Sequence, residues 1–459
     1  MTGPKTGLRA FAELAAASAF DRLTPAQADA ARMRTFDNLC STAVGLSIAD
    51  GQLLRRLADT PADAELSLAD EIRLYVGATR ATETDDIAIA CCVTVGSVVV
   101  PVAAAMAAQT PVDDRTFLTA VAAGYEAAIR LGVALDGGAL IYKGAWPTYL
   151  VAPFAAAAVA ARLKGLDARA TANALALALA RTPRWMGRSF DGASPRWMLL
   201  GAAAAEGVAA ARAAAEGIGG DLGILPAFAD AVGANVTEAA LEDGAMFGDA
   251  LLAVDAKTFP TSRQGLAATQ AFLTFSPLSR PISEIERVEL AAPGAYLRMI
   301  GSTAMPSNRI ESLLSVAYQM ALAAVRPDRL FDCGRETIHR DPEIADFMAK
   351  VVVVEDPLLN AAYPGEWGGG VRIVWRTGDS HALTIGDPEG SAHRALDWAA
   401  LTEKMRRLMP ASGLRFGLVQ PLLDHCRALG AQPHSPLCGR LTGDVERLSF
   451  QHRSPNVVG

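Results

Sequence analysis

The sequence predicts a mainly α-helical protein in which an all-helical domain is interrupted by a smaller α+β domain. From Thr24 to about Gly248 the chain is rich in alanine, with apolar residues three and four positions apart, which is the period of an amphipathic helix. After about Leu252 alternating and β-branched segments appear, and helical periodicity returns at Ala395. The expected parts are a first helical part at residues 1–252, an α+β domain at 253–394 and a C-terminal helical part at 395–459.

Local signals support the helical part. Thr24, Pro25 and Gln27 form a helix start, with a Thr N-cap, Pro at the first helical position and Gln three residues after the cap. The segments 153–166 and 201–217 contain so many small side chains that neighbouring helices can approach closely. A compact helical domain follows.

Strand signals define the second domain. Residues 285–290 alternate apolar and polar side chains, and residues 351–354 are a run of valines. Residues 371–375 lead through Thr377, Gly378 and Asp379 into 381–385, which predicts a hairpin. A segment with helical periodicity, residues 310–325, separates these strands, so the domain is expected to be α+β.

Composition favours a small-molecule ligand. The 459 residues carry 42 Lys+Arg and 49 Asp+Glu, for a formal net charge of −7. An acidic balance without a long basic run does not favour nucleic acid as a partner. The uncharged segment 87–112 contains Pro101 and many small residues, and we interpret it as buried helices, so no membrane role is expected.

The cysteines and the N-terminus favour a cytoplasmic protein. The six cysteines are scattered and do not form a spaced disulfide framework, and the N-terminal residues lack the features of a secretory signal. His425, Cys426, His434 and Cys438 match no standard zinc spacing, so no metal is expected. Gly217-Ile218-Gly219-Gly220 follows a helix and is interpreted as a helix C-cap and turn, so no dinucleotide cofactor is expected.

Titratable residues are unevenly distributed. All six histidines lie in the last third of the chain, and only six lysines accompany 36 arginines. Lys257 stands at the predicted domain junction, where a desolvated amine can act as a base and an arginine cannot. The alternative is a solvated junction lysine. Tyr318, in a predicted helix, is either a core tyrosine or a proton donor at a cleft.

Two polar groups are further candidates for a site. Glu83, Asp85 and Asp86 precede the uncharged run, where they either stabilise a helix N-terminus or serve a site. An arginine series interleaved with aromatic residues suits binding of a carboxylate between flat walls, although a solvated helix face with core aromatics is equally consistent. That series consists of Arg181, Arg184, Arg188 and Arg196 with Trp185, Phe190 and Trp197.

The sequence resembles the MmgE/PrpD family, which includes 2-methylcitrate dehydratase, cis-aconitate decarboxylase and iminodisuccinate epimerase. The resemblance covers nearly the whole chain. Its carriers are the ETDD cluster with residues 96–108, and the segments 117–132, 142–178, 256–263 (AKTFPTSR), 315–323 (SVAYQMALA) and 354–367. It implies a helical domain, a lid domain inserted before the last helices, an active site between the two, and a homodimer.

The chain departs from the family pattern at several working positions. Family members usually carry a histidine near the position of Val93, and another where this chain has Trp146. Arg196 replaces a family lysine, and Ser262 stands where the decarboxylase has a histidine. Lys257 and Tyr318 match the family. These departures weigh against methylcitrate dehydration or cis-aconitate decarboxylation.

The resemblance thus implies a cofactor-independent lyase or isomerase that abstracts a proton next to a carbonyl or carboxylate of a small organic acid or a partly apolar biosynthetic intermediate. Lys257 is assigned as base, Tyr318 as acid or enolate stabiliser, and Asp86 as orienting carboxylate. Substrate contacts are assigned to Arg196, Trp146, Thr148, Glu83, Asp85, Ser262 and Arg263. The alternative is a family member that has lost catalysis and acts as a binding or partner subunit.

Overall fold

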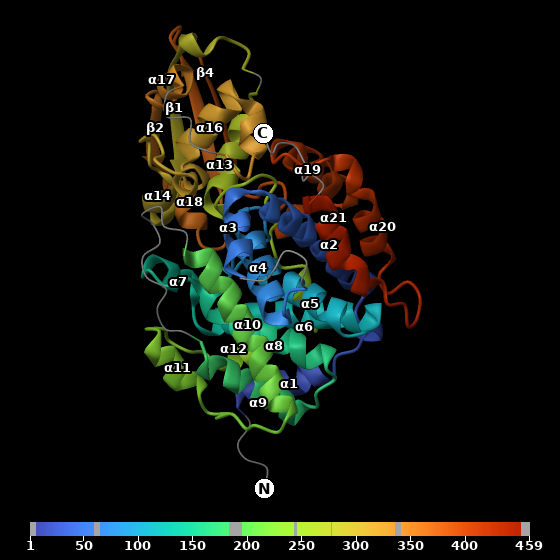
Figure 1. Cartoon of the computed structure of the whole chain (residues 1–459). Coiled ribbons are helices and arrows are strands. Elements are labelled where there is room, and N and C mark those ends of the chain that lie inside the picture. Colours follow the sequence, from blue (N-terminus) through green and yellow to red (C-terminus); the bar gives the residue numbers. More distant parts are fainter. Residues whose placement is uncertain are drawn as a thin grey trace. The chain divides into compact units, whose positions relative to one another are not determined.

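The structure is a computed structural model that describes residues 6–58, 65–182, 195–242, 246–276, 278–335 and 341–450. Within these residues the chain forms two compact units. The first contains the chain up to Val254 and from Leu414 onward, and the second contains Asp255 to Gly413. Figure 1 shows a mostly helical chain with one small sheet in the second unit, which confirms the predicted mainly helical class.

The first unit is built from helices joined by short connections. Its helices are α1 (Gly7–Ala16), α2 (Pro25–Ser47), α3 (Ala49–Leu57), α4 (Leu68–Ala81), α5 (Gly96–Gln109), α6 (Asp114–Ala134), α7 (Gly137–Tyr142), α8 (Pro147–Leu163), α9 (Ala168–Ala180), α10 (Pro195–Ala215), α11 (Leu225–Ala231), α12 (Ala239–Glu242), α20 (Gln420–Ala428) and α21 (Leu441–Phe450). The apolar helix α8 packs against α5, α6, α9 and α10. Helix α2 packs against α20 and α21, so the C-terminal helices complete this unit.

The start of α2 has the predicted capping box. Thr24 Oγ1 accepts a hydrogen bond from the Gln27 backbone N–H at 3.2 Å, and Gln27 Oε1 accepts one from the Thr24 N–H at 2.8 Å. At the other end of a helix, the glycine segment after α10 is the predicted C-cap. The N–H groups of Gly217 and Ile218 donate to the carbonyls of Ala214 and Ala213, which is the Schellman arrangement.

Small residues allow the helices of the first unit to approach closely, as expected. A Cβ atom added to Gly207 of α10 would lie 2.1 Å from the Pro153 carbonyl oxygen of α8. At Gly201 of the same helix it would lie 2.2 Å from the Arg73 carbonyl oxygen of α4. Helix α10 therefore contacts both neighbours through its backbone.

The segment 87–112 is only partly the pair of buried helices that we expected. Its first residues form a tight turn in which Ala88 and Val93 pair as an isolated antiparallel bridge, and α5 begins at Gly96. Cys92 in this turn has a φ of 57°, a left-handed conformation that helical periodicity does not reveal. Residues 91–107 of the segment are all buried, whereas residues 108–111, near its end, are exposed.

Two helices are long and apolar enough to cross a membrane by length and composition alone. These are α6 and the stretch Arg196–Ala215 of α10, and 89% and 56% of their most apolar windows are buried inside the structure. Core helices of globular proteins meet the same criteria, so they give little support to a membrane role.

The second unit combines a four-stranded mixed sheet with helices. Its elements are α13 (Arg263–Leu273), β1 (Ile285–Ala292), α14 (Gly294–Ile300), α15 (Arg309–Leu314), α16 (Val316–Val325), the 3-10 helix η4 (Pro327–Phe331), α17 (Pro342–Met348), β2 (Val351–Glu355), α18 (Pro357–Ala362), β3 (Gly369–Trp375), β4 (Ser380–Ile385) and α19 (Trp398–Ala411). The strand order is β2-β1-β3-β4, with β1 parallel to β2 and antiparallel to β3. Strands β3 and β4 form the predicted hairpin.

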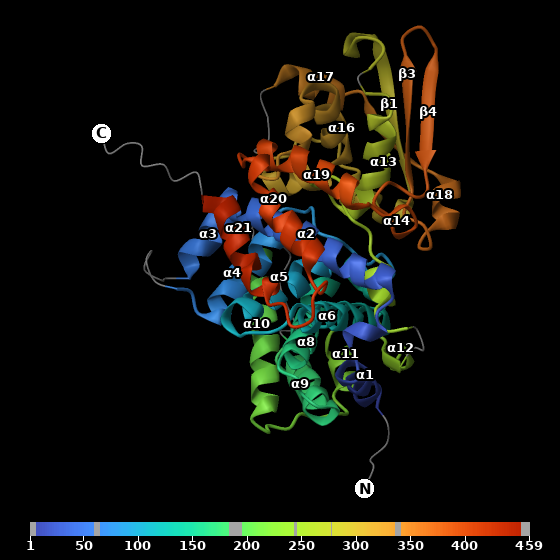
Figure 2. The ribbon, with the colours of Figure 1, turned by 90° about the vertical axis from the view of Figure 1, so that its right-hand side faces the viewer.

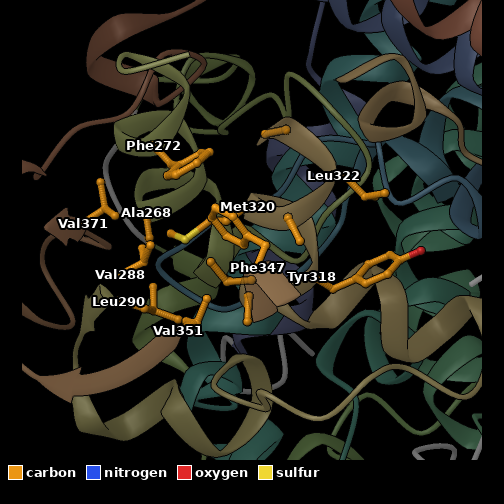
Figure 3. Close-up of a cluster of buried hydrophobic side chains, with 14 of the residues drawn as sticks. Ala268, Phe272, Val288, Leu290, Tyr318, Met320, Leu322, Phe347, Val351 and Val371 are labelled. Carbon is orange, nitrogen blue, oxygen red and sulfur yellow. The ribbon is translucent and has the colours of Figure 1, made fainter. Parts of the chain in front are cut away.

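Helices α13, α16 and α17 cover one face of this sheet, as Figure 2 shows. The core between them joins Phe272 of α13, Met320 of α16 and Phe347 of α17 to Val288 of β1 and Val371 of β3 (Figure 3). The alternating pattern that predicted β1 therefore corresponds to its buried face.

The second boundary between the units differs from the expected one. Helix α19 was expected to belong to the C-terminal helical part beginning at residue 395, but it packs against η4 and belongs to the second unit. The chain enters the first unit again at Leu414. Periodicity predicted that α19 is a helix but could not indicate which unit it packs on.

Candidate active site

The first unit contains a buried network of arginines and carboxylates that includes three predicted site residues. Arg80 comes from the last turn of α4, Glu83 and Asp85 from the segment after it, and Arg196 from the start of α10. Arg80 Nη1 lies 2.7 Å from Glu83 Oε2 and 3.5 Å from Asp85 Oδ1, and Arg196 Nη2 lies 4.0 Å from Glu83 Oε1. Glu83 thus joins the two guanidinium groups.

Two indole rings form the walls around Arg196. Its Cζ lies 4.1 Å from the centroid of Trp197 and 5.0 Å from that of Trp146, and Arg80 Cζ lies 5.4 Å from Trp197. Such stacking stabilises a desolvated guanidinium and fixes its plane. The arginine–aromatic arrangement predicted around Arg196 is present, whereas Arg184, Trp185, Arg188 and Phe190 lie outside the described residues.

A small pocket opens beside these side chains. It is lined by Arg80, Trp146, Thr148, Tyr149, Arg196, Trp197 and Leu200. Its volume of about 20 Å³ holds roughly one water molecule. Aromatic rings and the guanidinium groups of Arg80 and Arg196 line this small space.

The positive charges of Arg80 and Arg196 are largely compensated by the carboxylates of the same network. Burial opposes the charged form of Arg80, but the nearby carboxylates of Asp85 and Glu83 outweigh it and raise its pKa above the usual value. Glu83 also has a φ of 55°, in the left-handed region that is costly for a residue with a side chain. Strained residues are concentrated at functional sites, so this conformation supports Glu83 as a member of the site.

Asp86 and Thr148 make contacts within the helical core. Asp86 Oδ1 accepts from the Gly96 N–H at 2.7 Å, at the first turn of α5, and its Oδ2 accepts from the Tyr125 hydroxyl. Burial raises the pKa of Asp86, although Arg34 and these hydrogen bonds oppose the shift. Thr148 Oγ1 accepts from the Thr94 N–H at 2.9 Å. The structure thus groups Glu83 and Asp85 with the arginines, and places Asp86 at the N-terminus of α5.

The second unit holds the two residues that match the family. Lys257 is 1% exposed and precedes α13, and Tyr318 is 0% exposed and lies in the first turn of α16. The Tyr318 ring borders the hydrophobic cluster of this unit, and Figure 3 shows its hydroxyl directed away from that cluster. Both side chains are therefore shielded from water.

The backbone around Lys257 is held by a buried ion pair. Arg263 Nε lies 2.7 Å from Asp255 Oδ2, and its Nη1 donates to the Trp367 carbonyl at 3.0 Å. The Ala256 N–H donates to the Gly390 carbonyl at 2.7 Å. Arg263, predicted to contact substrate, thus fixes the segment that carries Lys257.

Ser262, another predicted site residue, is buried at the N-terminus of α13. Its Oγ has no hydrogen-bond partner among the described residues, although a buried hydroxyl is normally paired. An oriented but unsatisfied hydroxyl is suited to binding a polar group of a ligand.

Sequence reasoning missed Arg335, which accompanies Tyr318. This side chain is 1% exposed and donates to the carbonyls of Leu330 and Ser312 at 3.0 and 3.1 Å. Burial lowers its pKa to about 10, against an opposing electrostatic interaction with the Tyr318 phenol. Arg335 lies in a segment without a recognisable motif, so nothing in the sequence linked it to Tyr318.

Comparison with protein families identifies both parts of the chain. Residues 9–233 match the MmgE/PrpD N-terminal domain, and residues 259–413 match the MmgE/PrpD C-terminal domain. The chain belongs to the MmgE/PrpD family. Its members are typically dehydratases and other lyases. No curated protein matches the chain significantly.

Three positions of this MmgE/PrpD member differ from the residues that the family resemblance implies. Val93 closes the tight turn before α5, Trp146 stacks on Arg196, and Ser262 presents its buried hydroxyl. The resemblance implies a histidine near Val93 and one at Trp146, and in the decarboxylase a histidine at Ser262, where this chain has a hydrocarbon, an indole and a hydroxyl. None of these replacements exchanges a proton near neutral pH.

Proposed function

We propose that this protein is a cofactor-independent lyase or isomerase that removes a proton next to a carbonyl or carboxylate of a small organic acid or a partly apolar biosynthetic intermediate. The observation that carries the proposal is the burial of Lys257, which is 1% exposed on a segment fixed by the Asp255–Arg263 ion pair. A lysine side chain that is shielded from water is suited to proton transfer. The second unit serves as a lid in this scheme.

Lys257 acts as the base. Its amine takes the proton from carbon, and the electron pair left behind forms the carbon–carbon double bond of an enolate. An amine can cycle between neutral and charged forms, which the 36 arginines of the chain cannot do. A lyase then expels a leaving group from the adjacent carbon, and an isomerase returns a proton to a different face or position.

Tyr318 acts on the oxygen that becomes negative. Its hydroxyl donates a hydrogen bond to the enolate oxygen or delivers the returning proton. The buried guanidinium of Arg335 interacts electrostatically with the phenol. Arg335 is therefore a positioning residue in this scheme.

Arg196 anchors the carboxylate of the substrate, with Trp146 as the wall for an apolar part and Thr148 beside them in the pocket lining. Glu83, 4.0 Å from Arg196, and Asp85, 3.5 Å from Arg80, hold the two guanidinium groups in place. Asp86 orients the site indirectly, through the N-terminus of α5.

Hydrogen–deuterium exchange at carbon tests the proposal without knowledge of the final product. The full chain is incubated in D₂O with a panel of small 2-oxo, dicarboxylic and β-keto acids, and loss of C–H signals is followed by proton NMR. We expect exchange with at least one acid, a loss of more than about 100-fold in Lys257→Met, and a loss of about 10- to 1000-fold in Tyr318→Phe.

The controls for this test are matched by residue type. Lys164→Met and Tyr142→Phe alter side chains at the surface, and they should leave the exchange rate unchanged. Exchange that persists in both Lys257→Met and Tyr318→Phe would show that the proposed proton path is wrong.

The second candidate function is a binding or partner subunit without catalysis. The three replaced histidine positions and the internal compensation of Arg80 and Arg196 by Glu83 and Asp85 favour it. A ligand that binds by calorimetry to the unmodified chain without any C–H exchange would select this alternative.

We also propose that the protein is a cytoplasmic homodimer, as the family resemblance implies. Sedimentation analysis of the purified chain tests this assembly, and a species of 47.9 kDa at all concentrations would contradict it.

A further inference from the structure

The second unit contains a cavity that the proposed reaction does not use. Its volume is about 390 Å³, within the range of roughly 300–1,000 Å³ that small-molecule sites occupy. The cavity lies between α13, η4, the end of β4 and α19, and all of its lining residues belong to the second unit.

Much of the cavity lining is apolar. The apolar side chains are Phe259, Leu273, Phe331, Ile385 and Leu396. Phe259 and Phe331 pack edge to face with ring centroids 6.4 Å apart, so their relative orientation is fixed. An aromatic or aliphatic body of a ligand fits against such a surface.

The lining also contains charged side chains. Three are cationic (Arg394, Lys404 and Arg407) and two are acidic (Glu389 and Glu403). Glu403 already pairs with Arg407 at 3.0 Å and with Arg406, outside the lining, at 2.9 Å. The lining residues themselves thus include one more cationic than acidic side chain, which suits an anionic ligand.

Lys404 is a buried charged residue in the lining of this cavity. It is only 4% exposed although it lies in the helix α19, whose neighbouring positions Arg406 and Arg407 are at the surface. Arg407 is held over the Phe331 ring, with its Cζ 5.3 Å from the centroid. A buried ammonium in a cavity lined by aromatic rings is a good partner for a carboxylate.

The loop beside the cavity is also fixed. The Gln270 side chain accepts a hydrogen bond from the Glu389 N–H at 2.8 Å and donates to the Glu389 carbonyl at 2.9 Å. It also donates to Thr258 Oγ1 at 3.2 Å. The cavity is thus bounded by side chains whose positions are determined by the fold, as in a preorganised site.

We propose that this cavity is a second ligand site, which binds a monocarboxylate with an apolar body through Lys404. The site goes beyond the proposed reaction, since it uses neither Lys257 nor Tyr318. Its ligand is an effector or a second substrate that combines a carboxylate with an apolar body. Binding at this site does not require that the chain be an enzyme.

Calorimetric titration of the full chain with phenylacetate tests the proposal, with 2-phenylethanol as the neutral analogue and 2-phenylethylamine as the cationic one. We expect saturable binding of phenylacetate at one site, at least threefold tighter than either analogue. Absence of saturable phenylacetate binding, or a preference below threefold, overturns the proposal. This comparison uses the unmodified protein, so it does not depend on the folding of any variant.

Variants then assign the binding to the cavity. Lys404→Met keeps the length of the side chain and removes its charge, and Ala400→Phe fills the cavity from its lining. Each should weaken phenylacetate binding at least tenfold, whereas Lys350→Met, a mostly buried lysine elsewhere in the unit, should not change it. Binding that is unchanged in both cavity variants overturns the assignment.

The same titration with the Lys257→Met variant distinguishes this site from the proposed active site. Phenylacetate binding should be unchanged in this variant even if its C–H exchange activity is lost. Loss of binding in Lys257→Met would place the ligand at the proposed active site and overturn the second site.

Discussion

The Arg80 guanidinium lies 2.7 Å from the Glu83 carboxylate, and less than a tenth of either side chain is exposed. The same carboxylate approaches Arg196, whose guanidinium lies between two indoles. Glu83 is therefore the residue on which the charge balance of the first unit's site depends.

Glu83→Gln is expected to destabilise the first unit by about 3–5 kcal/mol, because it removes the carboxylate shared by two buried guanidinium groups and leaves Asp85 as the remaining counter-ion of Arg80. Urea unfolding followed by circular dichroism measures the change. The control is Glu206→Gln, which removes the partner of Arg181 in a more exposed ion pair and should cost no more than about 1 kcal/mol. Equal effects of the two variants would contradict a special role for the buried pair.

Arg263→Lys is expected to lower the free energy of unfolding by about 1–3 kcal/mol, the cost of leaving a buried acceptor unsatisfied. A lysine cannot reproduce the fork that binds both Asp255 and the Trp367 carbonyl. Tryptophan fluorescence in urea follows this change. Arg298→Lys, on the exposed side of α14, should remain within about 0.5 kcal/mol of the unmodified protein.

Gly207→Ala should destabilise the first unit by about 1–3 kcal/mol, because its Cβ would lie 2.1 Å from the Pro153 carbonyl oxygen. The matched substitution Gly443→Ala, in α21, meets no atom within 4 Å and should stabilise the helix by up to about 1 kcal/mol. Thermal unfolding of the two variants should therefore shift in opposite directions. Shifts of the same sign would indicate that the α8–α10 contact relaxes.

Glu71 makes the stability of the first unit depend on pH. Burial raises its pKa from 4.5 to about 7, with further contributions from Glu446 and Glu65 and an opposing hydrogen bond from Gln109. The folded state thus holds the proton more tightly than the unfolded state, so the free energy of unfolding falls as pH rises from about 4.5 to about 7.

Glu71→Gln removes this dependence and should flatten the stability profile over that range, with the largest gain over the unmodified protein above pH 7. Urea unfolding at a series of pH values checks the result. Glu216→Gln, at an exposed position after α10, serves as the control and should leave the profile unchanged.

The features of the fold that depend on neighbouring residues could be read from the sequence. The Thr24–Gln27 capping box, the Gly217 C-cap and the β3–β4 hairpin each follow from a few adjacent side chains. The unit to which α19 belongs depends on a contact with η4, about seventy residues earlier in the chain, and no local pattern encodes such a contact.

The same distinction applies to the candidate site. Sequence patterns identified Glu83 and Asp85 as a group and Arg196 among aromatic residues, because those residues are close in the chain. Arg80 pairs with Glu83, three residues further along the chain, and Glu83 has a left-handed backbone conformation that periodicity does not reveal. Arg335 interacts with Tyr318 only through the tertiary fold, so this arginine could not be predicted from the sequence.

The return of the chain to the first unit at Leu414 has a consequence for biosynthesis. Helices α20 and α21, which pack on α2, leave the ribosome only after the whole second unit has been translated. The surface of α2 on which these helices pack therefore remains uncovered while the inserted portion is synthesised and folds. A premature stop codon just after residue 413 would consequently damage the portion made first, and chaperones would be needed most during that interval.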